Sequence, residues 1–154
     1  MTTLFSSLGL KPELQTTLAA LEYTDMTPVQ AQSLPLVLQG IDVIVKAKTG
    51  SGKTAAFALG ILQQLSVEQY HTQALVICPT RELADQVAKE IRTLGRAIAN
   101  IKVLTICGGA PIGPQKQSLE RGAHIIVGTP GRLVDHIAKN TVQLGQLKQL
   151  VLDE

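Results

Sequence analysis

The sequence is poor in the residues that mark several common classes of protein. It has no tryptophan and four other aromatic residues, which is too few for a surface that binds RNA by stacking bases on rings. Fourteen Lys and Arg residues oppose twelve Asp and Glu residues, and the net charge of +2 is too small to identify a nucleic-acid binder by bulk electrostatics. Any nucleic-acid binding must therefore depend on individual residues placed for it.

Cysteines and long apolar runs are also scarce. The cysteines, Cys78 and Cys107, lie in apolar runs, which predicts buried thiols in a reducing compartment rather than a disulfide framework. Residues 1–10 have no cationic stretch before their apolar residues, unlike a secretory signal. The least charged long stretch, residues 54–67, is interrupted by polar residues and falls short of the ~20 apolar residues that span a membrane. We expect a soluble, cytoplasmic protein with no membrane partner and no disulfide partner.

What the sequence does contain is an alternation of strand and helix patterns. The 154 residues correspond to about one domain, and 45% hydrophobic residues are enough for a core. Five apolar runs are continuous rather than alternating, as in strands covered on both faces by helices: residues 42–45, 74–78, 102–107, 124–127 and 149–152. Helical spacing is found at residues 12–38, 55–65, 83–98 and 133–138, and loops at 108–114 and 140–145. The alternation predicts an α/β fold with a parallel central sheet flanked by helices.

Three threonines mark the starts of helices. Thr27 and Thr129 each precede a proline, which predicts an N-cap hydroxyl with proline at the first helical position. Thr80 is predicted to cap the helix that begins at Arg81. Because Thr80 and Thr129 directly follow predicted strands, both helix N-termini should open at the carboxyl edge of the sheet, where α/β folds bind ligands.

The strongest chemical signal is a phosphate-binding loop that follows an apolar run and opens a helix. The segment reads Ala47, Lys48, Thr49, Gly50, Ser51, Gly52, Lys53 and Thr54. Its glycines let backbone N–H groups close around a phosphate, Lys53 reaches the β- and γ-phosphate oxygens, and the Thr54 hydroxyl ligates Mg²⁺. The structural alternative is a glycine-rich turn followed by a chance Lys-Thr pair. The surrounding strand and helix patterns favour nucleotide binding.

A second signal lies where the sequence ends, in an apolar run followed by Asp153 and Glu154. In an enzyme with such a loop, the first carboxylate would hold Mg²⁺ and the second would activate the attacking water. The alternative is an acidic, frayed chain end. The presence of Lys53 in its loop favours the catalytic interpretation.

Arg81 and Arg132 each lie in the first turn of a predicted helix, where a cation opposes the helix dipole. The occurrence of an unfavourably placed arginine in two helices suggests a phosphate ligand near their N-termini. The alternatives are a salt bridge from Arg81 to Glu82 or Asp85, and arginines that are simply solvated. The pair Gly108-Gly109 could allow close approach of a nucleic-acid backbone, although a plain turn explains it equally well.

Gln30 has two interpretations that compete for one amide. Thr27 and Gln30 have the spacing of a capping box, in which the glutamine side chain returns to the N-cap N–H. Alternatively, the amide pairs with adenine N6 and N7. The three histidines have no metal-ligand spacing and are predicted to be structural or surface residues.

Together, these segments resemble the ordered motifs of the DEAD-box RNA helicase family, and the match runs essentially end to end. The motifs are residues 27–30, 47–54, 79–83, 108–109, 129–132 and 153–154. The amino-acid sequences of these motifs are most similar to those of a bacterial type of this family that acts on ribosomal RNA during ribosome assembly. The resemblance implies ATP and Mg²⁺ as cofactors and RNA, from ribosomal or pre-ribosomal particles, as partner. It also explains Ala47, since this family's loop commonly opens with alanine.

The resemblance implies roles for particular residues. Thr27, Gln30 and Tyr23 would recognise adenine, with Phe5 as the upstream aromatic. Lys53, Thr54, Asp153 and Glu154 would carry ATP hydrolysis, and Arg81, Gly109, Thr129 and Arg132 would contact the RNA sugar-phosphate backbone without reading bases. Glu22 departs from the family, which usually has glycine before the aromatic at Tyr23.

The resemblance also implies the organisation of the chain. Residues 1–31 would form a Q-motif region and residues 32–154 an incomplete RecA-like ATP-binding domain, with the Ser-Ala-Thr motif and the second helicase domain absent. We expect the 154 residues alone to be unstable and to lack RNA-stimulated ATPase activity. The alternatives are an ATP- or RNA-binding module without turnover and a small kinase with a phosphate-binding loop, for which the sequence offers no acceptor-binding lid.

Overall fold

The computed structural model describes residues 3–154, so the first two residues of the expected Q-motif region lie outside the described range. The chain divides into two compact units. Of the described residues, the first unit comprises 3–64 and Glu90–Ala99, and the second comprises Leu65–Lys89 and Asn100–Glu154. Helix α4 (Arg81–Leu94) begins in the second unit and ends in the first.

The first unit is helical. It contains the 3-10 helix η1 (Phe5–Leu8) and the helices α1 (Pro12–Ala20), α2 (Pro28–Leu38) and α3 (Lys53–Gln64). Helices α2 and α3 pack so closely that a Cβ at Gly60 would overlap the Cγ1 methyl of Val37. The start of α1 is tied to α3, since the Lys11 N–H donates to Gln63 Oε1 at 2.8 Å.

The predicted helical segment at residues 12–38 is interrupted by a tight turn after α1. The Tyr23 N–H donates to the Leu18 carbonyl at 2.8 Å and the Glu22 N–H to the Ala19 carbonyl at 3.0 Å. These two bonds form a Schellman motif, in which the residue after the C-cap adopts a left-handed conformation. That residue is Glu22, with φ of 60°. The turn therefore forms although the chain lacks glycine there.

The predicted strand at residues 42–45 is absent, and the prediction is wrong for this structure. Residues 41–48 have no regular secondary structure, and the Ile44 side chain is fully exposed at 102%. An extended segment becomes a strand only when a neighbour satisfies its backbone groups, and none of the described residues pairs with this one. An apolar run was therefore insufficient evidence for a strand.

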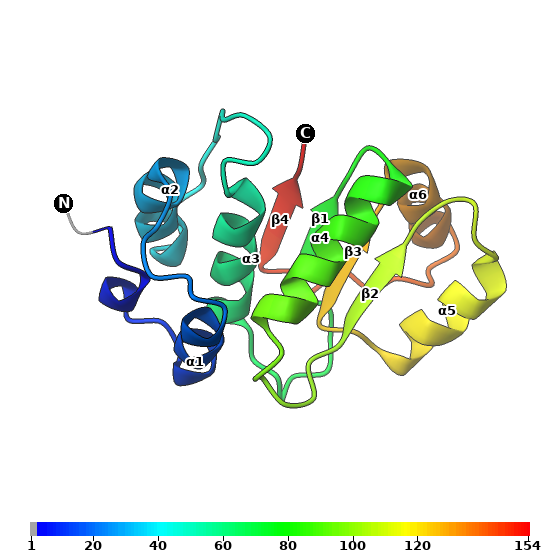
Figure 1. Cartoon of the computed structure of the whole chain (residues 1–154). Helices are drawn as coiled ribbons and strands as arrows, with labels where there is room; N and C mark the ends of the chain where they lie inside the picture. Colours follow the sequence, from blue (N-terminus) through cyan, green and yellow to red (C-terminus); the bar gives the residue numbers. More distant parts are fainter. Residues whose placement is uncertain (1–2) are drawn as a thin grey trace. The chain divides into compact units, whose positions relative to one another are not determined.

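The second unit is built on a parallel sheet in the order β2-β3-β1-β4 (Figure 1). The strands are β1 (Ala74–Ile77), β2 (Val103–Ile106), β3 (Ile125–Gly128) and β4 (Gln149–Leu152). All three pairings are parallel, so the four remaining strand predictions and the fold class are confirmed. Among the described residues, β4 pairs with β1 alone, and its Leu150 and Leu152 side chains are 56% and 73% exposed.

One face of this sheet is covered by α5 (Ile112–Arg121), α6 (Pro130–Ala138) and the segment after α6. Leu75, Ile106 and Ile126 of three adjacent strands pack there with Leu133 of α6, while Leu119 of α5 packs against this cluster. Helix α5 was not predicted, because its buried face includes the polar Gln115 and so lacks an apolar stripe. Within residues 3–154, every helix is too short or too polar to cross a membrane.

Candidate nucleotide and nucleic-acid sites

The predicted phosphate-binding loop forms a tight turn that leads into α3 at Lys53. Gly50 and Gly52 have φ of 82° and 93°, a left-handed conformation that favours glycine. A Cβ at Gly52 would lie 2.5 Å from Gln30 Nε2 and 2.9 Å from Thr27 Oγ1. Gly52 is therefore required by its neighbours as well as by its backbone conformation.

The loop has the features of an anion site. The Ser51 hydroxyl oxygen is buried and makes no hydrogen bond within residues 3–154, so it can donate to a ligand. The N-terminus of α3, a helix of 12 residues, begins directly after the loop. These residues fit a phosphate group. Thr54 carries a hydroxyl oxygen and Asp153 a carboxylate, and both are oxygen donors of the kind that Mg²⁺ prefers.

Gln30 forms the predicted capping box of α2. The Thr27 N–H donates to Gln30 Oε1 at 2.9 Å, and the Gln30 N–H donates to Thr27 Oγ1 at 3.4 Å. In addition, Gln30 Nε2 donates to the Gly52 carbonyl at 3.1 Å, and the side chain is only 5% exposed. The structural interpretation of this residue is confirmed. Recognition of adenine stays a prediction, since these bonds use one of the two N–H groups of Nε2 and one of the two lone pairs of Oε1.

The two aromatic residues assigned to the Q-motif region lie together. The rings of Phe5 and Tyr23 stack with centroids 6.5 Å apart and an angle of 24° between their planes. Phe5 is buried, while Tyr23 is 44% exposed. The exposed ring of Tyr23 can therefore meet a flat ligand while Phe5 supports it from below the surface.

The second unit gathers four motif segments at one edge of its sheet. Because all the strands are parallel, their carboxyl ends lie at the same edge. Thr80 and Arg81 follow β1, the glycine pair 108–109 follows β2, Thr129 follows β3, and Asp153 follows β4. The Asp153 N–H donates to the Ile77 carbonyl at 3.0 Å, which continues the β1–β4 pairing to this edge.

Arg81 lies exposed in the first turn of α4. Thr80 caps this helix as predicted, with the Leu83 N–H donating to its Oγ1 at 3.2 Å. Within the described part of the chain, no ion pair joins Arg81 to Glu82 or Asp85, which removes the salt-bridge alternative. Its Nη1 lies 3.2 Å from the position a Cβ would take at Gly109.

Thr129 occupies the N-cap position of α6, but its hydroxyl does not cap the helix, so this prediction is wrong. Thr129 Oγ1 instead accepts a hydrogen bond from the Gly108 N–H at 3.3 Å. Pro130 stands at the first helical position as predicted and has no N–H that needs a cap. The hydroxyl therefore joins the loops that follow β2 and β3.

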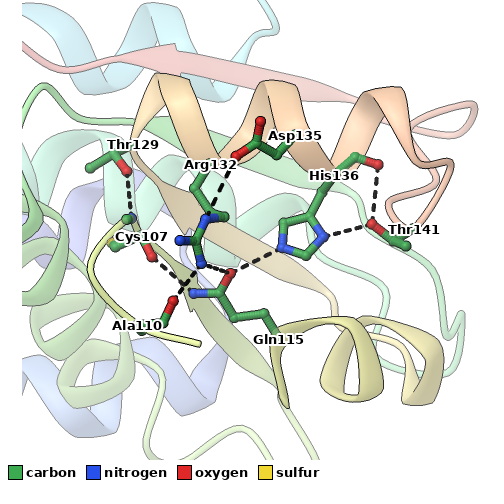
Figure 2. A network of polar contacts seen from close by, with 9 residues as sticks. Cys107, Ala110, Gln115, Thr129, Arg132, Asp135, His136 and Thr141 are labelled. Carbon is green, nitrogen blue, oxygen red and sulfur yellow. Dashed lines mark hydrogen bonds and ion pairs between the residues drawn. The ribbon is translucent and has the colours of Figure 1, made fainter. Parts of the chain in front are cut away.

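Arg132 is held by protein groups on several sides (Figure 2). Its Nη1 donates to the Ala110 carbonyl at 2.6 Å and to Gln115 Oε1 at 3.0 Å, and its Nε lies 3.8 Å from Asp135 Oδ2. The Arg132 side chain is 16% exposed. A freely solvated arginine, one of the alternatives considered from the sequence, does not describe it.

Gln115 and His136 complete this network and were not assigned to it from the sequence. His136 is fully buried, with Nε2 3.0 Å from Gln115 Oε1 and Nδ1 2.6 Å from Thr141 Oγ1. Burial, reinforced by the positive charges of Arg132 and Lys139, lowers the pKa of His136. This histidine is therefore structural, as expected, but no local pattern in the sequence indicates that it shares an acceptor with Arg132.

Both cysteines are free and buried near the same edge of the sheet. Burial, together with the negative charge of Asp153, raises the pKa of Cys78 to about 12. Burial and the charge of Asp85 also raise the pKa of Cys107, against the opposing charge of Arg81. Both thiols stay protonated at neutral pH, so neither is an activated nucleophile. Among residues 3–154, no group of three His, Cys, Asp or Glu side chains is placed to hold a metal ion.

The DEAD/DEAH box helicase family matches residues 27–154, and the chain belongs to this family. It is 60% identical over 153 residues to the ATP-dependent RNA helicase DbpA of Escherichia coli (strain K12), covering 99% of this chain and 34% of that protein. It is 44% identical over 154 residues to the helicase CshA of Bacillus subtilis (strain 168), covering 100% of this chain and 31% of that one. The chain thus spans about a third of the length of these relatives.

Solved structures give the same result for the fold. A DEAD box protein from the hyperthermophile Methanococcus jannaschii superposes with a TM-score of 0.93 at 37% identity, covering 99% of this chain and 41% of that chain. Saccharomyces cerevisiae Dbp5 bound to RNA and ADP BeF3 superposes with a TM-score of 0.89 at 32% identity, covering 99% and 38%. The expected family and the RecA-like fold class are confirmed.

Proposed function

We propose that this chain is the ATP-binding part of an RNA helicase that couples ATP hydrolysis to local separation of RNA strands. The observation that carries the proposal is the gathering of Arg81, Gly109 and Arg132 at one carboxyl edge of the sheet. Two guanidinium groups beside an open backbone segment suit successive phosphates of a nucleic-acid strand. Because phosphate groups are the same in every nucleotide, these contacts would not depend on base sequence.

The phosphate-binding loop would hold ATP. The backbone around Gly50 and Gly52 and the Ser51 hydroxyl would donate hydrogen bonds to the phosphates, and Lys53 would add a positive charge. Thr54 and Asp153 would hold Mg²⁺, which offsets the negative charge of the phosphates when bound. Glu154 would accept a proton from the attacking water.

Specificity for adenine would come from the first unit. Gln30 would pair with the base through the second N–H group and the second lone pair of an amide already bonded to the Thr27 N–H and the Gly52 carbonyl. Tyr23 would lie against the base, supported by its stacking on Phe5. The remaining residues of the phosphate-binding loop, Ala47, Lys48 and Thr49, would line the ATP site.

We also propose which RNA this helicase acts on and in which cellular compartment. We propose ribosomal RNA or pre-ribosomal particles as the partner, on the resemblance of the motifs to a bacterial type that acts there. A cytoplasmic location is supported by the two free, buried cysteines, which are typical of reducing compartments.

The decisive experiment measures phosphate release from ATP by the full-length protein, with and without single-stranded RNA. RNA-stimulated release that is lost in Lys53→Ala, with the variant still folded, would support the helicase proposal. Transfer of the phosphoryl group to a small acceptor would indicate a kinase instead. Binding of ATP and RNA without any release would indicate a binding module without turnover.

A further inference from the structure

We propose that Gln115 is a positioning residue that orients the guanidinium group of Arg132 toward a nucleic-acid phosphate. Gln115 lies on α5, outside every motif that the sequence singles out. Gln115 is 9% exposed, and its side chain contacts Cys107, directly after β2, and Arg132 and His136, both on α6. The inference rests on the proposed contact between Arg132 and RNA.

The orientation of the Gln115 amide follows from its partners. The guanidinium of Arg132 can only donate hydrogen bonds, and the Cys107 carbonyl can only accept them. Oε1 therefore faces Arg132 Nη1 at 3.0 Å, and Nε2 faces the Cys107 carbonyl at 2.9 Å. An amide fixed at both ends cannot flip without leaving two buried groups unsatisfied.

His136 reinforces this orientation. Because Gln115 Oε1 accepts, the Nε2 atom of His136 at 3.0 Å must donate to it. Thr141 Oγ1 lies 2.6 Å from Nδ1 and 3.1 Å from the His136 carbonyl, and in the neutral ring Nδ1 is the acceptor, so the single hydroxyl proton then serves Nδ1. Gln115 Oε1 thus receives one bond from His136 and one from Arg132, and the buried imidazole holds the amide oxygen in place (Figure 2).

These contacts fix Nη1 of the Arg132 guanidinium and leave Nη2 available for a ligand. The two N–H groups of Nη1 serve the Ala110 carbonyl and Gln115 Oε1, and Nε faces Asp135. Nη2, with its two N–H groups, has no acceptor within residues 3–154 (Figure 2). Since the guanidinium is planar, fixing Nη1 also fixes the direction of Nη2, which can then donate to phosphate oxygens.

The test compares matched variants of the full-length protein, with affinity for a fluorescently labelled single-stranded RNA measured by anisotropy. Gln115→Met keeps the volume of the side chain and removes its amide. Gln117→Met is the control, because Gln117 is exposed on the same helix and has no contact in this network. We expect Arg132→Ala to weaken RNA binding about tenfold, Gln115→Met about threefold or more, and Gln117→Met not at all.

A double-mutant cycle separates positioning from a general effect on folding. If Gln115 acts through Arg132, Gln115→Met in the Arg132→Ala background causes no further loss of RNA affinity. A loss that is the same in both backgrounds would overturn the positioning role. Affinity for a fluorescent ATP analogue, measured on each variant, should be unchanged.

A second variant keeps the inference testable if Gln115→Met does not fold. Gln115→Glu retains an acceptor oxygen for Arg132, and we expect it to keep most of the RNA affinity; a loss as large as that of Arg132→Ala would overturn the inference. Should Arg132→Ala itself bind RNA normally, the proposed role of Arg132 fails first. Should Arg132→Ala weaken binding while Gln115→Met does not, only the positioning role fails.

Discussion

At the scale of single residues, Glu22 shows how a turn can keep its geometry with an unfavourable side chain. The two hydrogen bonds of the Schellman motif place this residue at φ of 60°, where a side chain crowds the following carbonyl. The family resemblance identified Glu22 as a departure from glycine, and the backbone gives the physical reason for the glycine. The turn also sets the start of the segment that carries Tyr23.

We predict that Glu22→Gly raises the free energy of unfolding by about 0.5–1 kcal/mol, because relief of the left-handed conformation outweighs the extra freedom of the unfolded chain. Urea unfolding followed by circular dichroism measures this. Gln39→Gly is the matched control, since Gln39 is exposed with φ of −84° and should lose stability. Equal effects in the two variants would show that Glu22 is not strained.

His136 makes stability depend on pH. Its pKa is lowered mainly by burial and further by Arg132 and Lys139, while Asp135 acts in the opposite direction. The unfolded chain therefore binds this proton more readily, and stability is lost as the pH falls through the ordinary histidine pKa of about 6.5.

We accordingly predict a lower melting temperature at pH 5.5 than at pH 7.5, and a smaller difference in His136→Gln. Thermal melts at a series of pH values test this. His71→Gln, at a histidine outside the Gln115 network, is the control for removing a histidine elsewhere in the chain. A dependence that persists undiminished in His136→Gln would assign it to other groups.

At the scale of elements, the apolar runs correctly predicted the strands β1 to β4. These four segments do form strands because each pairs with a neighbouring strand through backbone hydrogen bonds. The same pattern failed at residues 42–45, since pairing is a property of two segments and is not visible in one. Helix α5 was missed for the opposite reason, because a buried polar residue, Gln115, interrupts its apolar face. Position along the chain could not reveal that Arg132 and His136 need that side chain.

The contact between α2 and α3 leaves no room for a larger side chain at Gly60. We predict that Gly60→Ala destabilises the protein by about 1–2 kcal/mol, because the added methyl overlaps Val37 and this overpacking outweighs the better helix propensity of alanine. Chemical denaturation measures the change.

Two further variants identify the cause. Gly113→Ala on α5 is the control, since a Cβ there meets no atom within 4 Å, and it should be neutral or stabilising. Val37→Ala combined with Gly60→Ala should recover part of the loss. If Gly60→Ala proves as stable as Gly113→Ala, the two helices pack less tightly than described.

At the scale of the whole molecule, the exposed apolar residues of β4 favour self-association. Leu150 and Leu152 are 56% and 73% exposed on a strand that, within residues 3–154, pairs on one side. We predict that the 154-residue chain elutes as oligomers in size-exclusion chromatography, and that Leu152→Lys shifts it toward the monomer. Val134→Lys, at a 62% exposed position on α6, should leave the elution unchanged. A monomeric, sharply melting chain would contradict this expectation.

The sequence predicts the motifs of the candidate sites, but it does not predict the hydrogen bonds between distant motifs. The loop at Gly50 and Gly52 and the capping box of Gln30 were identified because their chemistry depends on neighbours in sequence. The bond from Gln30 to the Gly52 carbonyl spans 22 residues, and nothing in either motif indicates it. Contacts of this kind depend on how loops meet after folding.

Two such contacts bear on the kinetics of nucleic-acid binding. The Gly108–Thr129 hydrogen bond joins the loops after β2 and β3, and the Ala110–Arg132 hydrogen bond joins the loop after β2 to α6. The conformational entropy of these loops is thus lost during folding and not during association. For an extended polyanion, the rate of arrival would then be governed by electrostatic steering toward the arginines rather than by rearrangement of the protein. Rapid association that slows steeply with added salt is the behaviour such a rigid edge implies.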